Sequence, residues 1–431
     1  MKRKIMTALK AWKENNSTAP LLLVGARQTG KTYILKQFCR EQFDDFLYAN
    51  FEEHEDLATI FEHDLDPREI VRKLAVFFNR VIDPRKTVIF FDEIQLCEKA
   101  VTSLKYFNEA EEDYKIVCAG SLLGVALNRS ASSFPVGKVF FMSLFPMDLG
   151  EFFSACGEEL LKEEITSAFE KNRPLPEALH RKALELYKYY LCVGGMPQAV
   201  REFLEKDRDV SRFDRAVQKH IILAYLADMA KYCGPAQAVK NTRVYNSMPR
   251  QLAREHKKFM YTTVEPGAKK ESYESAIHWL LQADLLLKSS RVDVPQKPLS
   301  VYEHPGYFKL FVSDVGLLAA LADIDFKDIL FETSLIYKGM LTENYVAQAL
   351  TANGRPLYYW QAKAMAEVDF LIRRESGIVP IEVKASDNTR SRSLESYVKR
   401  YAPEYSIRVS AKNFGFSGGI RSIPLYAAYN L

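Results

Sequence analysis

Residues 19–38 read APLLLVGARQTGKTYILKQF, and this stretch decides the fold class of the first part of the chain. The apolar run Leu21–Val24 has the length of a buried strand, and a helical pattern follows directly after Gly30. Gly25 and Gly30 permit tight turns that expose backbone N–H groups, and the helix N-terminus adds a dipole that favours anions. A strand, a glycine loop and a helix in this order predict a phosphate-binding loop.

The loop matches the pattern GxxxxGK(S/T), which is typical of ATP-binding P-loops. The Lys31 ammonium is expected to face the β and γ phosphates, and the Thr32 hydroxyl is expected to bind Mg²⁺. A glycine turn that matches by chance is the alternative, and the flanking strand and helix argue against it. We therefore expect ATP to contact Gly25, Ala26, Arg27, Gln28, Thr29, Gly30, Lys31 and Thr32.

A second apolar strand, within TVIFFDEIQ, ends in the carboxylates Asp92 and Glu93. Asp92 is expected to hold the Mg²⁺ through water. Glu93 is expected to orient or deprotonate the attacking water, because phosphoryl transfer needs mainly positioning and charge stabilisation. Acidic residues end many strands, but the combination with a P-loop favours an ATPase that turns ATP and water into ADP and phosphate.

Further apolar strands are expected at Phe46–Tyr48, Lys115–Ala119 and Val139–Leu144, with helical patterns between them, which predicts a parallel sheet covered by helices. Two polar residues follow strands of this sheet. Ser121 could sense the γ phosphate, and Asn50 could hydrogen-bond Glu93 and gate its activity. A plain loop or cap role is an equal alternative for both.

The whole chain has 431 residues, of which 48% are hydrophobic and 26% charged, with a formal net charge of +4. This length and composition predict two to four globular domains. No apolar run is long enough to span a bilayer, so we expect a cytoplasmic protein without a membrane partner. The six cysteines form no CxxC pair, which predicts reduced core residues and not zinc ligands.

The middle of the chain, from Glu151 to Asp228, has a helical pattern that predicts a lid over the nucleotide. Within it, the stretch YLCVGGMPQAV carries two adjacent glycines, which indicate either a hinge or a close contact between helices. Plain structural punctuation is the favoured interpretation.

Residues 241–320 follow the order helix, turn, longer helix and β ribbon, which is a winged-helix pattern. The helices are expected at Val244–Glu255 and Lys269–Leu287, and the ribbon strands at Lys288–Val294 and Tyr307–Val312. The longer helix would be the one that contacts DNA. It carries lysines but also glutamates that phosphate would repel, so a packing or partner-binding role is the favoured alternative.

The last part of the chain carries a second constellation of charged residues. Glu343 lies on an expected helix, Asp369 on the strand of EVDFLI, and Glu382 and Lys384 on the strand of IEVKAS. Because side chains alternate along a strand, Glu382 and Lys384 should share one face, with Asp369 beside them. The expected Mg²⁺ ligands are Glu343, Asp369 and Glu382, and the expected catalytic residues are Asp369, Glu382 and Lys384. A scaffold or ligand pocket is the alternative.

Several motifs together resemble a prokaryotic family of AAA+ related ATPases. They are GARQTGKT, FFDEIQ, CAGSLL, FFMSLFPMDLGEFF, YLCVGGMPQAV, FVSDVGLLAAL, GMLTENYVAQAL, EVDFLI and IEVKAS. The resemblance implies an ATPase core with a five-stranded parallel sheet, a winged helix and a C-terminal restriction-endonuclease-like domain of the PD-(D/E)xK type. It also implies that Ser121 occupies the sensor position.

The chain departs from this family at one position, where Gly137-Lys138 replaces the usual Gly-Arg. If that arginine reaches the nucleotide of a neighbouring copy, Lys138 is a poorer substitute because it lacks the planar guanidinium fork. Arg129 is the alternative cation. A homo-oligomer is a further expectation.

The sequence thus predicts an α/β multidomain chain: an ATPase core at 1–150, a helical lid at 151–240, a winged helix at 241–330 and a restriction-endonuclease-like domain at 331–431. The leading hypothesis is a Mg²⁺-ATP-dependent switch or motor that acts on DNA or another nucleic acid, with a metal-dependent nuclease domain. The alternative is a regulatory ATPase whose last two domains bind a protein or DNA partner without cleavage.

Overall fold

The computed structural model describes residues 1–15, 18–121, 137–362, 366–385 and 392–431, which form two compact units. The N-terminal unit comprises Lys2–Phe145 with Gln282–Asp284, and the C-terminal unit comprises Met1, Pro146–Leu281 and Leu285–Leu431. The boundaries expected near residues 240 and 330 therefore do not separate compact units.

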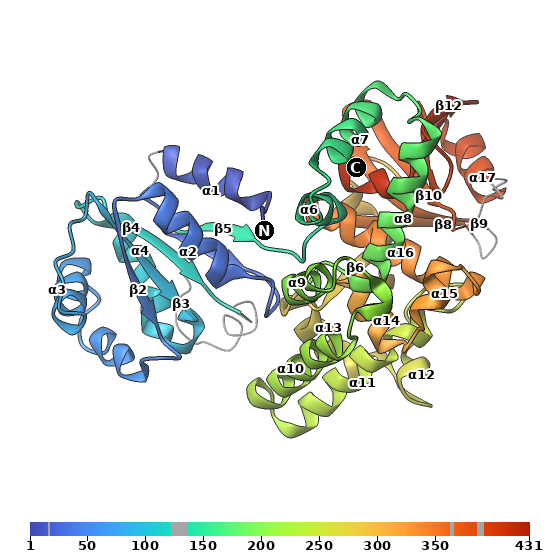
Figure 1. Cartoon of the computed structure of the whole chain (residues 1–431). Coiled ribbons are helices and arrows are strands. Elements are labelled where there is room, and N and C mark those ends of the chain that lie inside the picture. Colours follow the sequence, from blue (N-terminus) through green and yellow to red (C-terminus); the bar gives the residue numbers. More distant parts are fainter. Residues whose placement is uncertain (16–17, 122–136, 363–365, 386–391) are drawn as a thin grey trace. The chain divides into compact units, whose positions relative to one another are not determined.

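The N-terminal unit is built on five parallel strands in the order β2-β3-β4-β1-β5 (Figure 1). This confirms the predicted parallel sheet. The strands are β1 (Leu21–Val24), β2 (Asp45–Asn50), β3 (Thr87–Asp92), β4 (Lys115–Ala119) and β5 (Phe140–Ser143). The helical pattern expected at Leu122–Asn128 lies outside the described residues.

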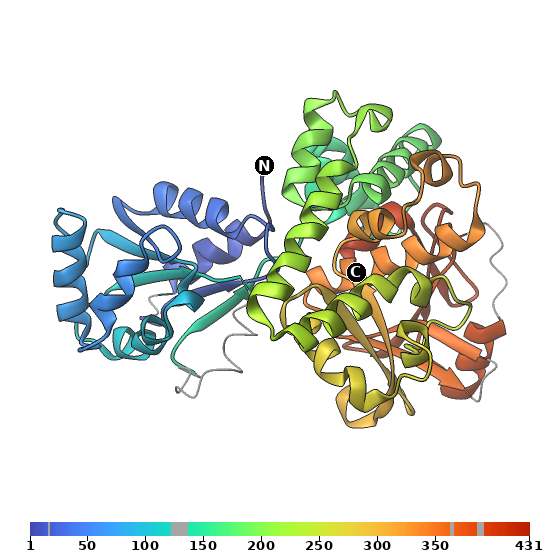
Figure 2. The same cartoon turned by 90° about the horizontal axis from the view of Figure 1, so that it is seen from below.

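Helices cover both faces of this sheet, as Figures 1 and 2 show from two directions. Leu21 and Leu23 of β1 pack with one layer of helices, while Leu22 packs with the other, as the period of two along a strand requires. The first layer is α1 (Ile5–Glu14) and α2 (Lys31–Gln42), and the second is α3 (Pro67–Phe77), α4 (Glu98–Glu109) and the 3-10 helix η1 (Glu55–Phe61).

The C-terminal unit contains an eight-stranded mixed sheet in the order β12-β13-β11-β10-β9-β8-β6-β7. Its strands are β6 (Leu286–Val292), β7 (Glu303–Val312), β8 (Leu357–Ala362), β9 (Ala366–Arg374), β10 (Gly377–Val383), β11 (Ser406–Ser410), β12 (Gly415–Ser417) and β13 (Ile420–Pro424). Its helices are α6 (Leu149–Ala155), α7 (Glu159–Lys171), α8 (Glu177–Val193), α9 (Pro197–Glu205), α10 (Ala216–Tyr232), α11 (Pro235–Leu252), α12 (Tyr261–Val264), α13 (Lys270–Gln282), α14 (Val315–Leu321), α15 (Phe326–Leu330), α16 (Leu335–Ala352) and α17 (Arg392–Tyr401).

The expected ribbon after α13 is present as β6 and β7, but it is not a separate wing. Residues Ser289–Val292 of β6 pair in parallel with Leu357–Trp360 of β8, so the ribbon forms one edge of the large sheet. The expected long helix also ends earlier, at Gln282. Asp284 adopts a positive φ of 56°, and the Leu285 amide donates to the Leu280 carbonyl, which closes the helix.

The two adjacent glycines of the middle segment lie where three stretches of backbone meet. The Gly195 amide donates to Asp314 Oδ2 at 2.6 Å, and the Met147 amide donates to the Gly195 carbonyl at 2.7 Å. A Cβ at Gly195 would overlap the Met147 carbonyl, and one at Gly194 would overlap Asp314 and Gly316. The geometry is therefore a close backbone contact, the second of the two alternatives predicted from the sequence.

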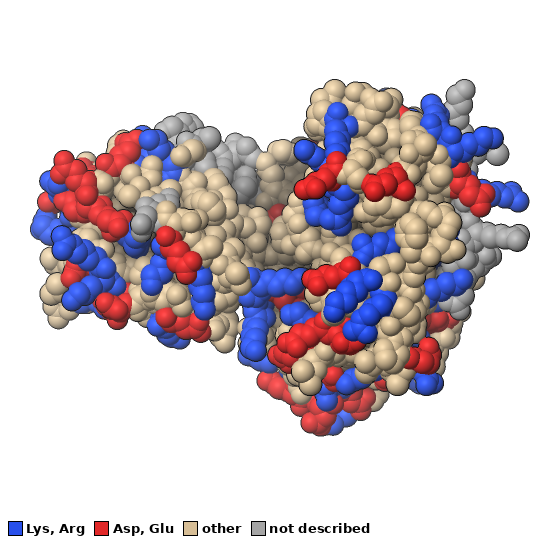
Figure 3. All heavy atoms as spheres, turned by 90° about the horizontal axis from the view of Figure 1, so that it is seen from above, with Lys and Arg blue, Asp and Glu red and all other residues tan. Residues whose placement is uncertain are grey.

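No described helix is both long and apolar enough to cross a lipid bilayer. All six cysteines are buried free thiols. On the face seen in Figure 3, Lys and Arg are interspersed with Asp and Glu on each unit, so neither unit presents a field of one sign there.

We expect Gly195→Ala to lower the free energy of unfolding by about 2 kcal/mol or more, because the added methyl must displace backbone and not a flexible side chain. Gly234→Ala is the matched control, since nothing lies within 4 Å of its added Cβ and its φ is an ordinary −62°. Urea unfolding would measure both. Equal stability of the two variants would contradict the close contact.

Candidate functional site

The glycine loop between β1 and α2 adopts a conformation that ordinary residues resist. Gly25 and Gly30 have positive φ values of 146° and 94°, and Gln28 lies in the left-handed region at 67°. A Cβ at Gly25 would overlap the carbonyl of Leu144, which follows β5. Only glycine therefore allows the loop to turn at this point against the neighbouring strand.

The Lys31 side chain lies inside this loop. Its ammonium donates to the carbonyls of Gly25 and Ala26, both at 2.9 Å, and the residue is only 6% exposed. Burial lowers the pKa of Lys31 to about 8, although the nearby Glu93 carboxylate raises it again in part. Phosphate oxygens would give this ammonium stronger acceptors than two neutral carbonyls.

Asp92 ends β3 and joins the loop to the neighbouring strands. Its Oδ1 accepts from the Thr32 hydroxyl at 3.2 Å, and its Oδ2 accepts from the Tyr48 hydroxyl at 2.9 Å. Burial raises the pKa of Asp92, while these hydrogen bonds lower it. The Thr32 hydroxyl and the Asp92 carboxylate are hard oxygen donors side by side, which fits a Mg²⁺ ion.

Glu93 follows Asp92 with a positive φ of 51°, which turns its side chain away from the strand direction. Glu93 Oε2 accepts from Ser121 Oγ at 2.9 Å and from Gln95 Nε2 at 2.5 Å. The residue expected to sense phosphate therefore contacts the carboxylate expected to activate water. Gln95 was not predicted, although its place two residues after Glu93 is a signal that could have found it.

Asn50 is directed to a different partner from the one expected. Its amide donates to the Tyr48 hydroxyl and to Glu53 Oε1, both at 3.0 Å, and not to Glu93. The reason is local, because Asn50 Oδ1 accepts the Glu52 amide at 2.8 Å and so holds its own turn. The Asn50 side chain is linked to the Asp92 carboxylate through the Tyr48 hydroxyl.

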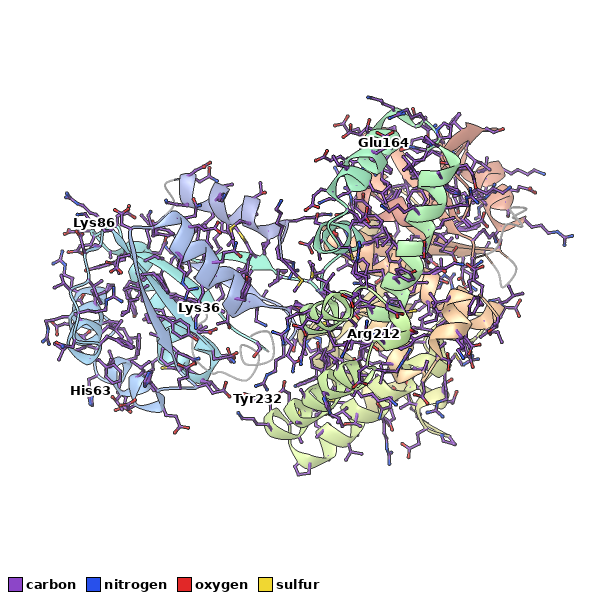
Figure 4. The ribbon with its side chains drawn as sticks, in the orientation of Figure 1. Lys36, His63, Lys86, Glu164, Arg212 and Tyr232 are labelled. Carbon is purple, nitrogen blue, oxygen red and sulfur yellow. The ribbon has the colours of Figure 1, made fainter. Side chains whose placement is uncertain are left out.

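Tyr48 is a second residue of this site that the sequence analysis missed. It lies two positions before Asn50 on β2, so the alternation of side chains could have placed both on one face. Lys36, which Figure 4 labels on α2, places its ammonium 3.5 Å from the Tyr48 ring centroid, in cation–π geometry. Lys36 and Asp92 thus both restrain the tyrosine.

Of the two cations considered as arginine fingers, Lys138 is the one that lies within the described residues. Lys138 pairs with Glu109 at 3.0 Å on the surface of the N-terminal unit. Arg129 lies outside the described residues.

The C-terminal constellation is organised around Lys309, a buried residue of β7. Its ammonium lies 3.0 Å from Glu343 Oε1 and also pairs with Glu367. The other oxygen of Glu343 pairs with Lys257. Burial would raise the pKa of Glu343, but the two ammonium groups lower it to about 2.

Asp369 lies near this cluster. Its Oδ2 accepts the Val383 amide at 2.8 Å. Burial raises its pKa to about 7, and the neighbouring Glu343 carboxylate contributes to the rise. The sequence analysis did not predict the roles of Lys309, Lys257 and Glu367. For Lys309, a lysine within the apolar run YFKLFV was the signal that could have found it.

Glu382 lies on β10 and Lys384 directly follows this strand; their charged groups lie 3.1 Å apart, in agreement with the shared face that their spacing predicted. Arg408 of β11 also approaches Glu382, at 3.4 Å. Asp369 does not join them. Within the described residues, no group of three or more acidic, His or Cys side chains is arranged to hold a metal ion.

A β-bulge in β9 separates Asp369 from Glu382. Tyr358 pairs with Leu371 and Trp360 with Val368, so β9 has one extra residue against β8. Val368 and Leu371 consequently pack on the same side, in the core under α17. Asp369 faces the other side, with Lys309 and Glu343. Glu382 follows the alternation of Ile378 and lies on the α17 side.

Three segments of the chain match family models. Residues 17–153 match a model described as "AAA domain". Residues 184–328 and 338–428 match two models that are each described as a domain of unknown function, DUF8612 and DUF4143. No curated protein matches the chain.

Solved structures resemble the chain only distantly. A Walker-type ATPase of Pyrococcus abyssi has 16% identity and a TM-score of 0.45, with 74% of this chain and 95% of that chain covered. The ORC2 protein of Aeropyrum pernix, in ADPNP–ADP complexes, has 12% identity and a TM-score of 0.38, covering 77% and 95%. Cdc6p from Pyrobaculum aerophilum has 12% identity and a TM-score of 0.28, covering 77% and 96%.

The family match and the parallel five-stranded sheet fall on the same part of the chain, so residues 17–153 have the sequence pattern and the sheet order of an AAA domain.

Proposed function

We propose that the N-terminal unit binds Mg²⁺-ATP in its glycine loop and hydrolyses it at Glu93. The observation that carries this proposal is the convergence of Lys31, Asp92 and Glu93 at the carboxyl edge of β1 and β3. Lys31 holds the β and γ phosphates, and Thr32 with Asp92 holds the metal ion. When bound, the ion neutralises charge on the phosphates.

Glu93 orients and deprotonates the attacking water in this proposal. Its carboxylate is held by Ser121 and Gln95, which donate to the same oxygen and leave the other oxygen for the water. Ser121, which follows β4, is placed to report a change at the phosphates to Glu93. The chain through Asn50, Tyr48 and Asp92 supports the metal side of the site.

We further propose that the C-terminal unit serves as a binding module for a protein or DNA partner and does not cleave nucleic acid. The observation that favours this alternative is the occupation of both Glu343 oxygens by lysine ammonium groups. A divalent ion there would have to displace two cations from a buried site. The mixed charge of α13, where Lys270 pairs with Glu274, gives no reason to favour DNA over protein.

ATP affinity should fall as the pH rises above about 8, because only the protonated Lys31 offers a charge to the phosphates. The pKa of Lys31 is lowered in the free protein, so binding of ATP must be accompanied by proton uptake above that pH. The limiting slope is tenfold per pH unit. Lys31→Arg should flatten the profile, since guanidinium stays charged, and Lys31→Ala should abolish binding. Calorimetric titration between pH 7 and 9.5 measures this, and a flat wild-type profile would contradict it.

Glu93→Gln should keep ATP bound but slow hydrolysis by about 100-fold or more, since general base catalysis is lost while Asp92 and Thr32 remain. The amide preserves the size of the side chain. Phosphate release and nucleotide affinity would be measured on the same variant. Ser121→Ala is the graded control, because it removes one of two donors to Glu93, and its effect should be smaller. Wild-type turnover in Glu93→Gln would move the base elsewhere.

Lys309→Met should lower the free energy of unfolding by about 3–5 kcal/mol, because Glu343 and Glu367 lose a fully buried counter-charge. Lys384→Met is the matched control. Its side chain is 30% exposed and Arg408 remains beside Glu382, so its cost should stay below about 1 kcal/mol.

The same proposal predicts that Mn²⁺ leaves the melting temperature unchanged when nucleotide is absent, and that no DNA or RNA is cut. Metal-dependent cleavage that is lost in Asp369→Ala would overturn it and support the nuclease hypothesis.

A further inference from the structure

A cavity of about 1190 Å³ opens at the ends of two inner strands of the eight-stranded sheet, in the C-terminal unit alone. It lies where β9 ends, where β8 begins and where the chain enters β11. Three separate segments supply its basic side chains, which are Lys297 before β7, Arg355 before β8, and Arg373 and Arg374 at the end of β9. The cavity is far from the Glu343 cluster along these strands and uses none of its residues.

The side chains that line this cavity do not balance its charge. Four cations and two carboxylates, Glu375 and Glu404, line it, which leaves a net charge of +2 for the lining side chains. Across the described part of the chain, none of the four cations forms an ion pair with an Asp or Glu side chain. Lys297 donates to the Glu375 carbonyl at 2.8 Å, and Arg374 donates to the backbone oxygen of Leu431 at 3.1 Å.

The arginines are also close enough to repel one another. Burial lowers the pKa of Arg374, and the like charge of Arg355 lowers it further. Burial likewise lowers the pKa of Arg421, which lies next to Arg374 and is affected by its charge. The Nε atoms of Arg355 and Arg421 are buried and have no hydrogen-bond partner within the described structure. Clustered guanidinium groups with unused donors cost free energy unless an anion joins them.

The chemistry of the lining selects a kind of anion. Arginine presents a planar fork that matches phosphate oxygens in pairs, and charge-assisted bonds of this type are strong. Tyr358 and Tyr405 add two aromatic side chains to the wall, on which a planar base can stack. The volume is much larger than one phosphate requires and is of the size that holds small organic ligands.

We propose that this cavity binds the phosphate group of a nucleotide unit, with Arg355 and Arg374 as its phosphate ligands and a tyrosine beside the base. The nucleotide unit is either free or the phosphorylated end of a strand. This site is independent of the P-loop and does not require ATP hydrolysis.

The test uses the full chain carrying Lys31→Ala, so that the P-loop does not contribute to binding. Fluorescence anisotropy compares a short single-stranded oligonucleotide that carries a 5′ phosphate with the same oligonucleotide carrying a 5′ hydroxyl. We expect the phosphorylated form to bind about 10-fold tighter or more, a difference of about 1.4 kcal/mol. Competition by AMP identifies the free nucleotide as a ligand, and AMP that fails to compete assigns the site to strand ends. Inorganic phosphate alone should compete more weakly than either.

Arg355→Gln and Arg374→Gln should each reduce the preference for the 5′ phosphate by about 10-fold. Arg355 lies before β8 and outside the strands, so its variant tests the site even if Arg374→Gln is unstable. Arg250→Gln is the matched control, since Arg250 is an exposed arginine of α11 outside the cavity. Equal affinity for the two oligonucleotides, or an unchanged preference in Arg355→Gln, would overturn the proposal.

Discussion

The parallel alignment of the first five strands is the constraint on which the candidate nucleotide site depends. Because all the strands run in one direction, their carboxyl ends meet at one edge, and the glycine loop, Asp92, Glu93, Asn50 and Ser121 gather there from four strands. The ladder continues past the strands, since the Gly120 amide donates to Leu23 and the Phe51 amide donates to Asp92. The loops that carry the site are thus fixed by the sheet itself. Lys31 is buried inside the glycine loop, and this burial lowers its pKa.

Glycine makes the same kind of contact possible in both units. Gly25 lets the P-loop pass against the carbonyl of Leu144, and Gly195 lets the start of α9 pass against the carbonyl of Met147. In each case the absence of a side chain lets two backbone segments touch at a place where a Cβ atom would keep them apart. Asp314 completes the second contact, since it accepts from the Gly195 and Leu317 amides while it caps α14. Burial raises the pKa of Asp314 to about 6, even though these amides lower it.

Buried charge organises the C-terminal unit in a different way. Lys309 is fully buried, yet the carboxylates of Glu343 and Glu367 outweigh the effect of burial and raise its pKa. Such a cluster has a large cost if one member is lost, which ties β7, α16 and β9 together. Within the described residues, the arginines that line the cavity at the ends of β8 and β9 have no carboxylate side chains paired with them. The positive and negative charges of the Lys309 cluster compensate one another, and this cluster stabilises the fold. The arginines of the cavity lack such compensation in the part of the chain that the structure describes, and we therefore assign them the role of binding an anion.

The sequence alone determined the AAA-type core at residues 17–153. A glycine loop between a strand and a helix, and a strand that ends in two carboxylates, are local patterns, and local backbone geometry is enough to specify their chemistry. It also predicted that Glu382 and Lys384 share a face, because alternation along one strand is local too. Tertiary structure decided the partners of Asn50, the membership of β6 and β7 in the large sheet, and the separation of Asp369 from Glu382. The separation of Asp369 from Glu382 depends on a single extra residue in β9 and on the contact of Lys309 with Glu343. The place of β6 and β7 depends on a strand neighbour that is distant in sequence. No local pattern encodes which distant residue a side chain will meet.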